Sequence, residues 1–380
     1  MLYWLYQFSD VFSPLRMFRY ITFRTVAAAG TAFILSLIFG PWLIKKLSAI
    51  NFGEQRVDER VKHLDLSDKV GTPTMGGLLI LFTTGFATVL WAMPGNFYVL
   101  CALTTFCFLG VLGFIDDYAK IKRANGLSPR VKMAAQAGWT VIFLFALSSN
   151  TDTSLRVQQL MVPFFKDPVI GSMGLIGTFA FLFLVLVGSS NAVNLTDGLD
   201  GLAIGCTNSA MAAYLVMAYV AGHYTFAQYL QIPFVSGAGE LSIFCGALFG
   251  AGLGFLWFNC HPARVFMGDT GSLAIGGGIA AVAILIKQEL VLIIVGGVFV
   301  MEAASVLIQQ GWFKITKRIY GTGRRVFRCA PIHHHFHFIA KDRAEAVGKP
   351  VGAAENMITV RFWILAIIFA FIGVATLKIR

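Results

Sequence analysis

Apolar runs long enough to cross a lipid bilayer recur along the whole chain. The sequence is 57% hydrophobic and only 13% charged, and its mean hydropathy is +0.73. An apolar stretch of about 18 or more residues can span the hydrocarbon core as a helix. The alternating pattern of a membrane β-barrel is absent, and runs this long disfavour a soluble domain of buried helices. The sequence therefore predicts an all-α polytopic membrane protein.

We expect about ten transmembrane helices in a single membrane domain, residues 1–380, without an internal repeat. Residues 1–22 interleave aromatic and Arg residues and lack a cleavage site, so they predict an interfacial segment and not a signal peptide. The expected spans are 23–44, 75–93, 97–118, 131–149, 170–190, 200–221, 239–258, 265–286, 290–313 and 358–378.

Basic residues are divided unequally between the two sides of this topology. Of the 30 Lys and Arg residues, 22 lie on the side of the loops that follow odd-numbered spans. The positive-inside rule makes that side cytoplasmic and both termini periplasmic. The largest of these loops is 314–357, which carries a histidine motif. The net charge of +11 fits loops that face an anionic leaflet, so we expect no nucleic-acid partner.

Five aspartates lie within or at the ends of the apolar runs, where a charged side chain is costly and usually functional. They are Asp116, Asp117, Asp197, Asp200 and Asp269. All five fall at the predicted cytoplasmic ends of spans, as does the histidine-bearing loop. The topology was deduced from Lys and Arg alone, so this convergence is independent of it. The sequence therefore predicts one polar site at the cytoplasmic edge of the membrane.

Asp116 and Asp117 are adjacent at the end of the third expected span. Neighbouring carboxylates repel unless a cation or a proton lies between them. A hard divalent cation, or a shared proton used in base catalysis, would explain the pair. The alternative is a solvated pair at a helix end, neutralised by Lys120 or Lys122.

The segment NAVNLTDGLDGL at 191–202 is more specific. Asp197 and Asp200 are three residues apart, so one helical turn would place both on the same face. Asn194 adds a neutral hydrogen-bonding group. The alternative is an N-cap for the following helix, but a cap needs one acid, and this segment has two acids and an Asn.

The segment FMGDTGSL at 266–273 predicts a helix start that carries Gly268, Asp269 and Ser272. Free backbone N–H groups at a helix start favour phosphate, and Asp269 could hold Mg²⁺. Asn259, just upstream, adds a polar group to the same edge. Capping of the helix by these residues alone is the alternative.

The segment GTPTMGG at 71–77 contains Thr74 and follows Lys69. A lysine beside flexible backbone suits a phosphate, although the spacing is not that of a P-loop. An ordinary helix entry would have the same composition and is the alternative.

Three consecutive histidines follow Pro331, and His337 lies two residues beyond them. Histidines here could bind zinc, contact phosphate or act in acid–base chemistry. Adjacent histidines diverge and are poor ligands for one tetrahedral ion, so we favour phosphate contact over zinc.

Carboxylates, basic groups and glycine-flanked helix starts together describe a diphosphate site that uses Mg²⁺. A site at the membrane edge implies that one reactant is a lipid. The other reactant would be a nucleotide-linked donor that arrives from the cytoplasm.

At these motifs the chain resembles the phospho-N-acetylmuramoyl-pentapeptide transferases (MraY), within the polyprenyl-phosphate N-acetylhexosamine-1-phosphate transferases. The histidine triplet after proline favours the muramoyl-pentapeptide branch over the N-acetylglucosamine branch. The resemblance runs nearly end to end and rests on GTPTMGG at 71–77, GFIDDY at 113–118, NAVNLTDGLDGLA at 191–203, GAGLGFLWFN at 250–259, VFMGDTGSLA at 265–274 and PIHHH at 331–335.

The resemblance implies a reaction in peptidoglycan synthesis. UDP-N-acetylmuramoyl-pentapeptide and undecaprenyl phosphate would give lipid I and UMP, with Mg²⁺, at the inner face of the bacterial inner membrane. It also implies ten spans and a homodimer.

The same resemblance implies roles for individual residues. Asp269 matches the family's Mg²⁺-binding aspartate, and Asp116 matches the proposed base for the lipid phosphate, with Asp117 beside it. The other matched positions are associated with nucleotide and diphosphate binding or with turnover. They are Lys69, Thr74, Asn194, Asp197, Asp200, Asn259, Gly268, Ser272, His333 and His334. Among them, His333 is placed with the catalytic residues.

The chain departs from the family pattern after the histidine triplet. The family often has an acid where this chain has His337, and the stretch 338–357 is longer than usual. These departures bear on preference for the donor peptide.

Two other functions compete with the transferase. One is an N-acetylglucosamine-1-phosphate transferase, and the other is a transporter or flippase, which would place its acids near the midplane, often with repeat symmetry.

Overall fold

The computed structural model describes residues 1–50, 71–123, 126–346 and 352–379. In this part of the chain almost all regular structure is helical, which confirms the predicted all-α class. The α-helices are α1 Ile21–Ile50, α2 Gly77–Trp91, α3 Phe97–Arg123, α4 Pro129–Ser149, α5 Gly174–Thr196, α6 Leu202–Ala221, α7 Tyr224–Leu230, α8 Leu241–Asn259, α9 Gly268–Leu285, α10 Val291–Val295, α11 Gly297–Tyr320, α12 Ile332–Ala346 and α13 Gly352–Ala375. Short 3₁₀ helices form at η1 Leu2–Phe8, η2 Ser13–Arg19, η5 Arg156–Gln158 and η6 Ala238–Glu240.

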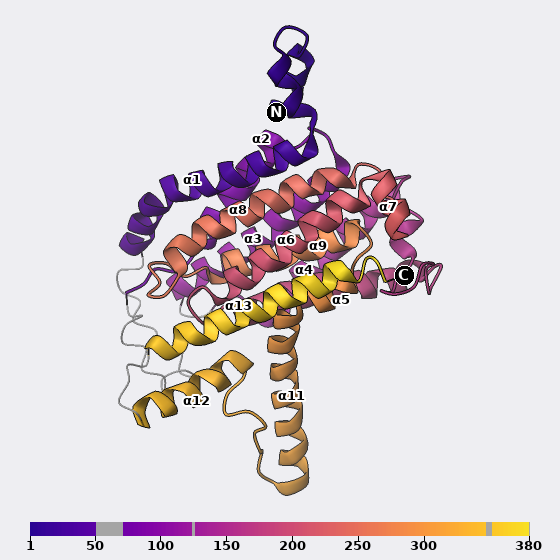
Figure 1. The fold of residues 1–380 in the computed structure, drawn as a ribbon. Helices are drawn as coiled ribbons and strands as arrows, with labels where there is room; N and C mark the ends of the chain where they lie inside the picture. The colour runs from indigo at the N-terminus through magenta and orange to yellow at the C-terminus, as the bar shows by residue number, and fades with distance from the viewer. Residues whose placement is uncertain (51–70, 124–125, 347–351, 380) are drawn as a thin grey trace.

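Eight of the described helices are long and apolar enough to cross a membrane. The second expected span corresponds to α2, which has only 15 residues. The ninth, 290–313, is wrong as a single continuous span. It is divided at Gly296 into α10 and α11, and Figure 1 shows α11 running across the direction of the other long helices. A glycine pair at 296–297 permits this break, and the cations near the end of α11 suit a polar boundary.

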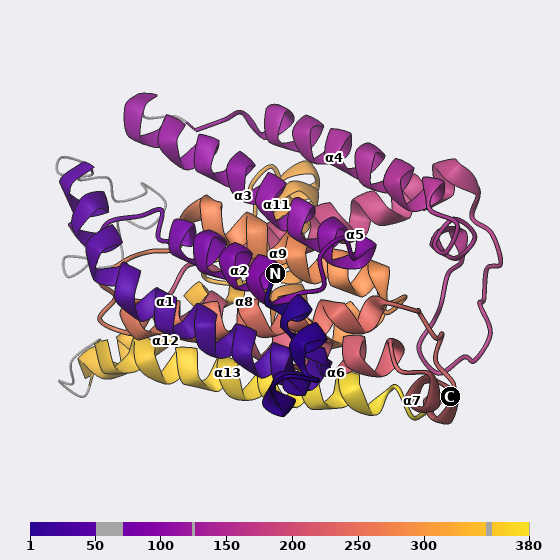
Figure 2. The same ribbon diagram turned by 90° about the horizontal axis from the view of Figure 1, so that it is seen from above.

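The buried centre of the bundle is α9, in which every residue from Thr270 to Leu285 is buried. It packs against α3 and α5, while α8 packs against α1 and α6 (Figure 2).

Glycines allow the closest approaches between these helices. A Cβ on Gly77 would come within 2.1 Å of the backbone of Gly271, and one on Gly113 within 2.2 Å of the Asp269 carbonyl oxygen. Only glycine fits at such positions, so these residues set the separation of α2 and α3 from α9.

The start of α2 and the start of α9 lie together. Gly76 N donates to the carbonyl of Phe266 (2.8 Å), and Gly77 N donates to that of Met267 (2.9 Å). At the other end of α2, the Met1 ammonium donates to the Val89 and Leu90 carbonyls. The N-terminus therefore lies at the end of the bundle away from the start of α9.

The C-terminus lies at that same far end. Near its start, α13 contacts the α5–α6 turn, where Thr359 Oγ1 donates to the Asp200 carbonyl and Trp363 Nε1 to that of Gly201. Near the end of the chain, Lys378 Nζ donates to the Tyr229 carbonyl, beyond the far end of α6. Both termini thus share one face, as predicted, while its periplasmic location stays a prediction.

Candidate active site

Three carboxylates from two helices meet at one end of the bundle. Asp116 and Asp117 lie near the end of α3, and Asp269 is the second residue of α9. Each contributes an oxygen to a group whose atoms all lie within 4.8 Å of one another. Asp116 and Asp117 are buried, and Asp269 is partly exposed. The predicted convergence of these three aspartates is therefore confirmed.

Asp117 caps the N-terminus of α9. Its Oδ1 accepts from Asp269 N (3.1 Å), and its Oδ2 accepts from Thr270 N (2.9 Å) and Thr270 Oγ1 (2.7 Å). These bonds satisfy two N–H groups that a helix start leaves without an internal partner, and a negative charge there is stabilised by the helix dipole. Asp117 thus fixes the backbone that carries Asp269.

Gly268 makes this close approach possible. Its φ is +72°, in the left-handed region. A Cβ at this position would come within 2.6 Å of Asp117 Oδ2 and 2.9 Å of Thr74 Oγ1. Gly268 therefore lies between the capping carboxylate and Thr74, and a larger residue would separate α9 from α3.

Two lysines neutralise the carboxylates. Lys132, in the first turn of α4, has its Nζ 2.7 Å from both Asp116 Oδ2 and Asp269 Oδ2. Lys120 Nζ lies 2.7 Å from Asp116 Oδ2 and 3.1 Å from Asp269 Oδ2. Asp116 Oδ1 accepts from Leu127 N at 2.6 Å. The sequence pointed to Lys120 as a possible partner but missed Lys132. Its one signal was its position at the start of a helix close after the aspartate pair.

Asn194 joins α5 to this cluster. Its Nδ2 lies 2.8 Å from Asp269 Oδ1 and 2.8 Å from Ser272 Oγ, and Ser272 Oγ donates to the Gly268 carbonyl. The structure therefore brings Asn194, Gly268 and Ser272 together around Asp269, with Thr74 on the other side of Gly268.

Asp197 lies in the turn between α5 and α6, within the electrostatic field of the cluster. Its removal from water raises the pKa of this carboxyl to about 7, and the charges of Asp269 and Asp117 act in the same direction. A backbone N–H of Gly268 opposes the shift. Asp197 is therefore a group whose charge changes near neutral pH.

Asp200 and Asn259 contact each other's segments. Asp200 Oδ2 accepts from Ala263 N (3.1 Å) and lies 3.0 Å from His261 Nδ1. Asn259 Oδ1 accepts from Gly201 N (3.1 Å), and its Nδ2 donates to the Val265 carbonyl (2.8 Å). These bonds hold the α5–α6 turn against the segment that leads into α9. His261, which the sequence places with Asn259 at this edge, belongs to the second polar group.

His333 lies in the first turn of α12 and is fully buried. Its Nδ1 is 3.0 Å from Oε2 of Glu302, a buried residue of α11 that the sequence analysis did not identify. The His334 ring lies next to it, with the ring centroids 4.1 Å apart. Lys69, also predicted for the site, lies outside the described residues.

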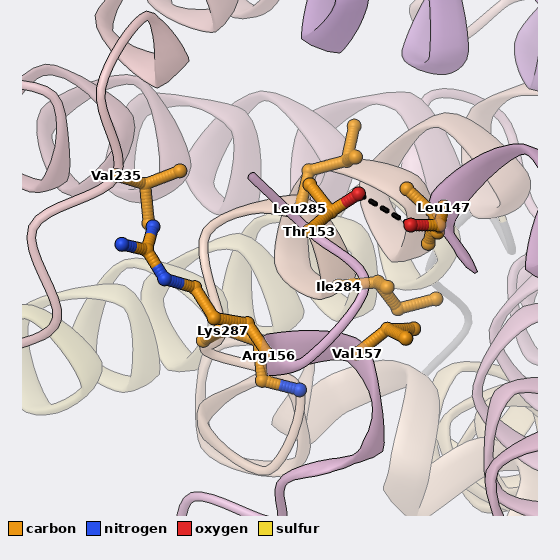
Figure 3. A pocket seen from close by; sticks show the side chains of 8 residues that line it. All are labelled: Leu147, Thr153, Arg156, Val157, Val235, Ile284, Leu285 and Lys287. Atoms are coloured by element: carbon orange, nitrogen blue, oxygen red, sulfur yellow. Dashed lines mark hydrogen bonds between the residues drawn. The ribbon is translucent and has the colours of Figure 1, made fainter. Parts of the chain in front are cut away.

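A small cavity elsewhere in the bundle is too remote to serve this site. Figure 3 shows it at the far ends of α4 and α9, lined by residues that include Leu147, Ile284 and Lys287. Its volume is about 20 Å³, enough for a single water. Asp269 and Leu285 lie 16 positions apart on α9, which separates the two places by roughly 24 Å.

The comparisons with known proteins agree with this arrangement. The family model described as "Glycosyl transferase family 4" matches residues 99–287. A signature described as "Phospho-N-acetylmuramoyl-pentapeptide-transferase signature 1" matches residues 69–81, at the start of α2. Both matches cover segments that build the site.

Relatives match the chain over its whole length. A phospho-N-acetylmuramoyl-pentapeptide-transferase of Desulforapulum autotrophicum is 47% identical, covering 100% of this chain and 99% of its own. One from Neisseria gonorrhoeae is 46% identical over 100% of both chains. Another from Desulfatibacillum aliphaticivorans is 49% identical over 96% of this chain and 95% of its own.

The chain belongs to the phospho-N-acetylmuramoyl-pentapeptide transferase family. Membership of this transferase family favours the muramoyl branch over the N-acetylglucosamine branch, in agreement with the histidine triplet at 333–335. It also argues against a transporter, whose acids would lie near the midplane. In this transferase family member the acids lie where α3 ends and α9 begins.

Proposed function

We propose that the protein transfers phospho-N-acetylmuramoyl-pentapeptide from its UDP-linked donor to undecaprenyl phosphate, which gives lipid I and UMP. The observation that carries this proposal is the cluster of Asp116, Asp117 and Asp269 with two lysines at one end of a membrane bundle. Such a mixture of acids and cations suits two phosphate-bearing substrates, one of them a lipid.

The carboxylate cluster fits a divalent cation. Its oxygens form the hard donor set that Mg²⁺ prefers. The ammonium of Lys132 lies between Asp116 and Asp269, so a positive charge is already favoured between these two carboxylates. We assign Asp269 as the principal ligand. When bound, Mg²⁺ would neutralise the diphosphate and stabilise charge on the departing UMP.

Asp116 and the lysines act on the lipid phosphate in this proposal. Asp116 Oδ2 is the acceptor of a phosphate proton, and it lies 2.7 Å from the ammonium groups of both Lys120 and Lys132. Lys120 and Lys132 can then donate to phosphate oxygens, which would otherwise be repelled by the carboxylates. Asp117 contributes by holding the start of α9 in place.

The donor would lie over the α9 start and the α5–α6 turn. The helix dipole at the start of α9, where Gly268 and Ser272 lie, favours its diphosphate. The other predicted contacts are distributed around this point. They are Lys69, Thr74, Asn194, Asp197, Asp200, Asn259, His333 and His334.

We place this site on the cytoplasmic side of the bacterial inner membrane, because 22 of the 30 Lys and Arg residues lie on that side of the topology. The UDP-linked donor would then reach it from the cytoplasm and undecaprenyl phosphate from the bilayer. A homodimer is expected from the family resemblance.

The deciding experiment measures UMP release by the purified protein in detergent with Mg²⁺ and undecaprenyl phosphate. UDP-N-acetylmuramoyl-pentapeptide and UDP-N-acetylglucosamine are supplied separately, and reactions without the lipid serve as controls. We expect lipid-dependent release from the first donor alone. Release from UDP-N-acetylglucosamine alone would move the protein to the other branch, and release from neither would overturn the proposal.

A further inference from the structure

Glu302 is a fully buried carboxylate that the transfer reaction, as proposed above, does not yet use. It lies on α11 and has no exposed surface. A charge removed from water is costly unless it is paired. Its partner is His333 on α12, so the pair joins the helix that leaves the bundle to the histidine motif (Figure 1).

Within the described part of the chain, the hydrogen bonds of the Glu302 carboxylate go to His333. Oε2 lies 3.0 Å from the ring Nδ1 and 3.4 Å from the backbone N of the same residue. His333 is the second residue of α12, so the carboxylate also faces the N-terminus of that helix, where negative charge is favoured. One oxygen therefore fixes both the start of α12 and the plane of the imidazole.

This contact determines which ring nitrogen carries hydrogen. A carboxylate only accepts hydrogen bonds, so Nδ1 must be the donor. Nε2 is then left for another group, and in the described part of the chain this buried atom has no hydrogen-bond partner. Glu302 thus frees Nε2 for a ligand, as a carboxylate does behind a metal-bound or catalytic histidine.

Nε2 is directed at the α5–α6 turn. A Cβ on Gly198 would lie 2.3 Å from it, and Gly198 follows Asp197 directly. A side chain at this position would collide with the ring, so glycine allows the imidazole to lie this close to the turn. The free ring nitrogen therefore faces the turn that we assign to the donor.

We propose that Glu302 is the positioning residue for His333: it accepts the Nδ1 hydrogen and directs Nε2 to the donor substrate at the Asp197–Gly198 turn. Because Nε2 then carries no hydrogen, it can only accept, and the ligand class that fits it is a hydroxyl group of the sugar in the UDP-linked substrate. The inference rests on the proposed transfer function. A purely structural role, in which Glu302 only caps α12, makes different predictions for the variants below.

The first test is a double-mutant cycle on UMP release. Glu302→Leu should lower kcat/KM at least about tenfold, the effect of losing one charge-assisted hydrogen bond. Glu302→Gln should recover part of that loss, because its amide oxygen still accepts from Nδ1. In a His333→Ala background Glu302→Leu should have no further effect. Independent, multiplicative losses would overturn the proposal.

The second test reads the ring directly and does not depend on turnover. The ¹⁵N imidazole signals of the solubilised full chain, with His333 assigned through His333→Gln, should show hydrogen on Nδ1. This preference should disappear in Glu302→Leu; an unchanged tautomer there would contradict the proposal. If the wild-type protein released no UMP, the proposed function would fail, while the spectrum would still decide the pairing.

A third variant tests Nε2 without disturbing the pair, and covers the case in which Glu302→Leu fails to fold. Gly198→Ala places a methyl group against Nε2. We expect kcat/KM to fall at least about tenfold while hydrogen stays on Nδ1. Glu289→Gln is the matched control for Glu302→Gln, since Glu289 is also a buried carboxylate and is paired with Lys287 at the other end of α9. Unchanged activity in Gly198→Ala would refute the orientation of Nε2.

Discussion

The capping of α9 by Asp117 gives a sharp prediction for Asp117→Asn. The wild-type carboxylate accepts three hydrogen bonds, two from backbone N–H groups and one from Thr270 Oγ1. Asn keeps one accepting oxygen, loses the charge and directs an NH₂ group at a donor. Loss of a charged cap of this kind costs about 2 kcal/mol. Thermal stability should fall by a few degrees.

Activity should fall as well, because the cap holds the backbone of Asp269 in place. A displacement of about 1 Å at a reacting group can cost on the order of 100-fold in rate. We therefore expect Asp117→Asn to lower kcat and Tm together. Thr270→Val, which removes only one of the three donors, should lower both by less.

The assay combines thermal unfolding in detergent with UMP release over a Mg²⁺ titration. Asp167→Asn, at an exposed loop position, is the control for the substitution itself. If Asp117 were mainly a metal ligand, Asp117→Asn would raise the Mg²⁺ requirement and leave the Tm measured in EDTA unchanged. That outcome would refute the capping argument.

Three further predictions concern the charges of the site. Asp269→Asn should lower Mg²⁺-dependent UMP release by about 100-fold or more, and a near-normal rate would remove Asp269 from the reaction. Lys132→Met should lower Tm more in EDTA than in Mg²⁺, because Asp116 and Asp269 then lose one of the two ammonium groups that contact both of them; equal losses would show that lysine and metal do not share them. The pKa of Asp197 is raised to about 7, so the folded protein holds a proton that the unfolded chain releases above about pH 4. Without divalent cations, wild-type Tm should therefore fall relative to Asp197→Asn from about pH 4 to pH 7, and parallel curves would contradict the shift.

Hydropathy predicted most of the fold because the bilayer leaves few alternatives. A spanning segment must satisfy its backbone internally, so an apolar run of sufficient length becomes a helix. The segment 290–313 passed this test and still divided at Gly296. A hydropathy average does not register a glycine pair or the direction of the next helix. The departure of α11 from the bundle is a property of packing and could not be predicted from composition.

Site residues could be predicted where a charged side chain costs free energy because it lies in an apolar run, as Asp116 and Asp269 do. Lys132 and Glu302 were missed for different reasons. Lys132 resembles any cation at the polar start of a helix, and only the return of α4 toward α3 brings it to the carboxylates. Glu302 is a lone acid in the sequence, and its partner lies 31 residues away. Pairings over that separation depend on tertiary structure.

Capping and catalysis were alternatives in the sequence, and the structure joins them. The start of α9 needs a cap, and Asp117 supplies it from α3. Asp269, the acid that could have capped its own helix, is thereby left to face Lys120, Lys132 and Asn194. Two adjacent aspartates on α3 can therefore serve different purposes. Asp117 holds the helix start, while Asp116 contacts Lys120 and Lys132 and is the residue that we propose as the base.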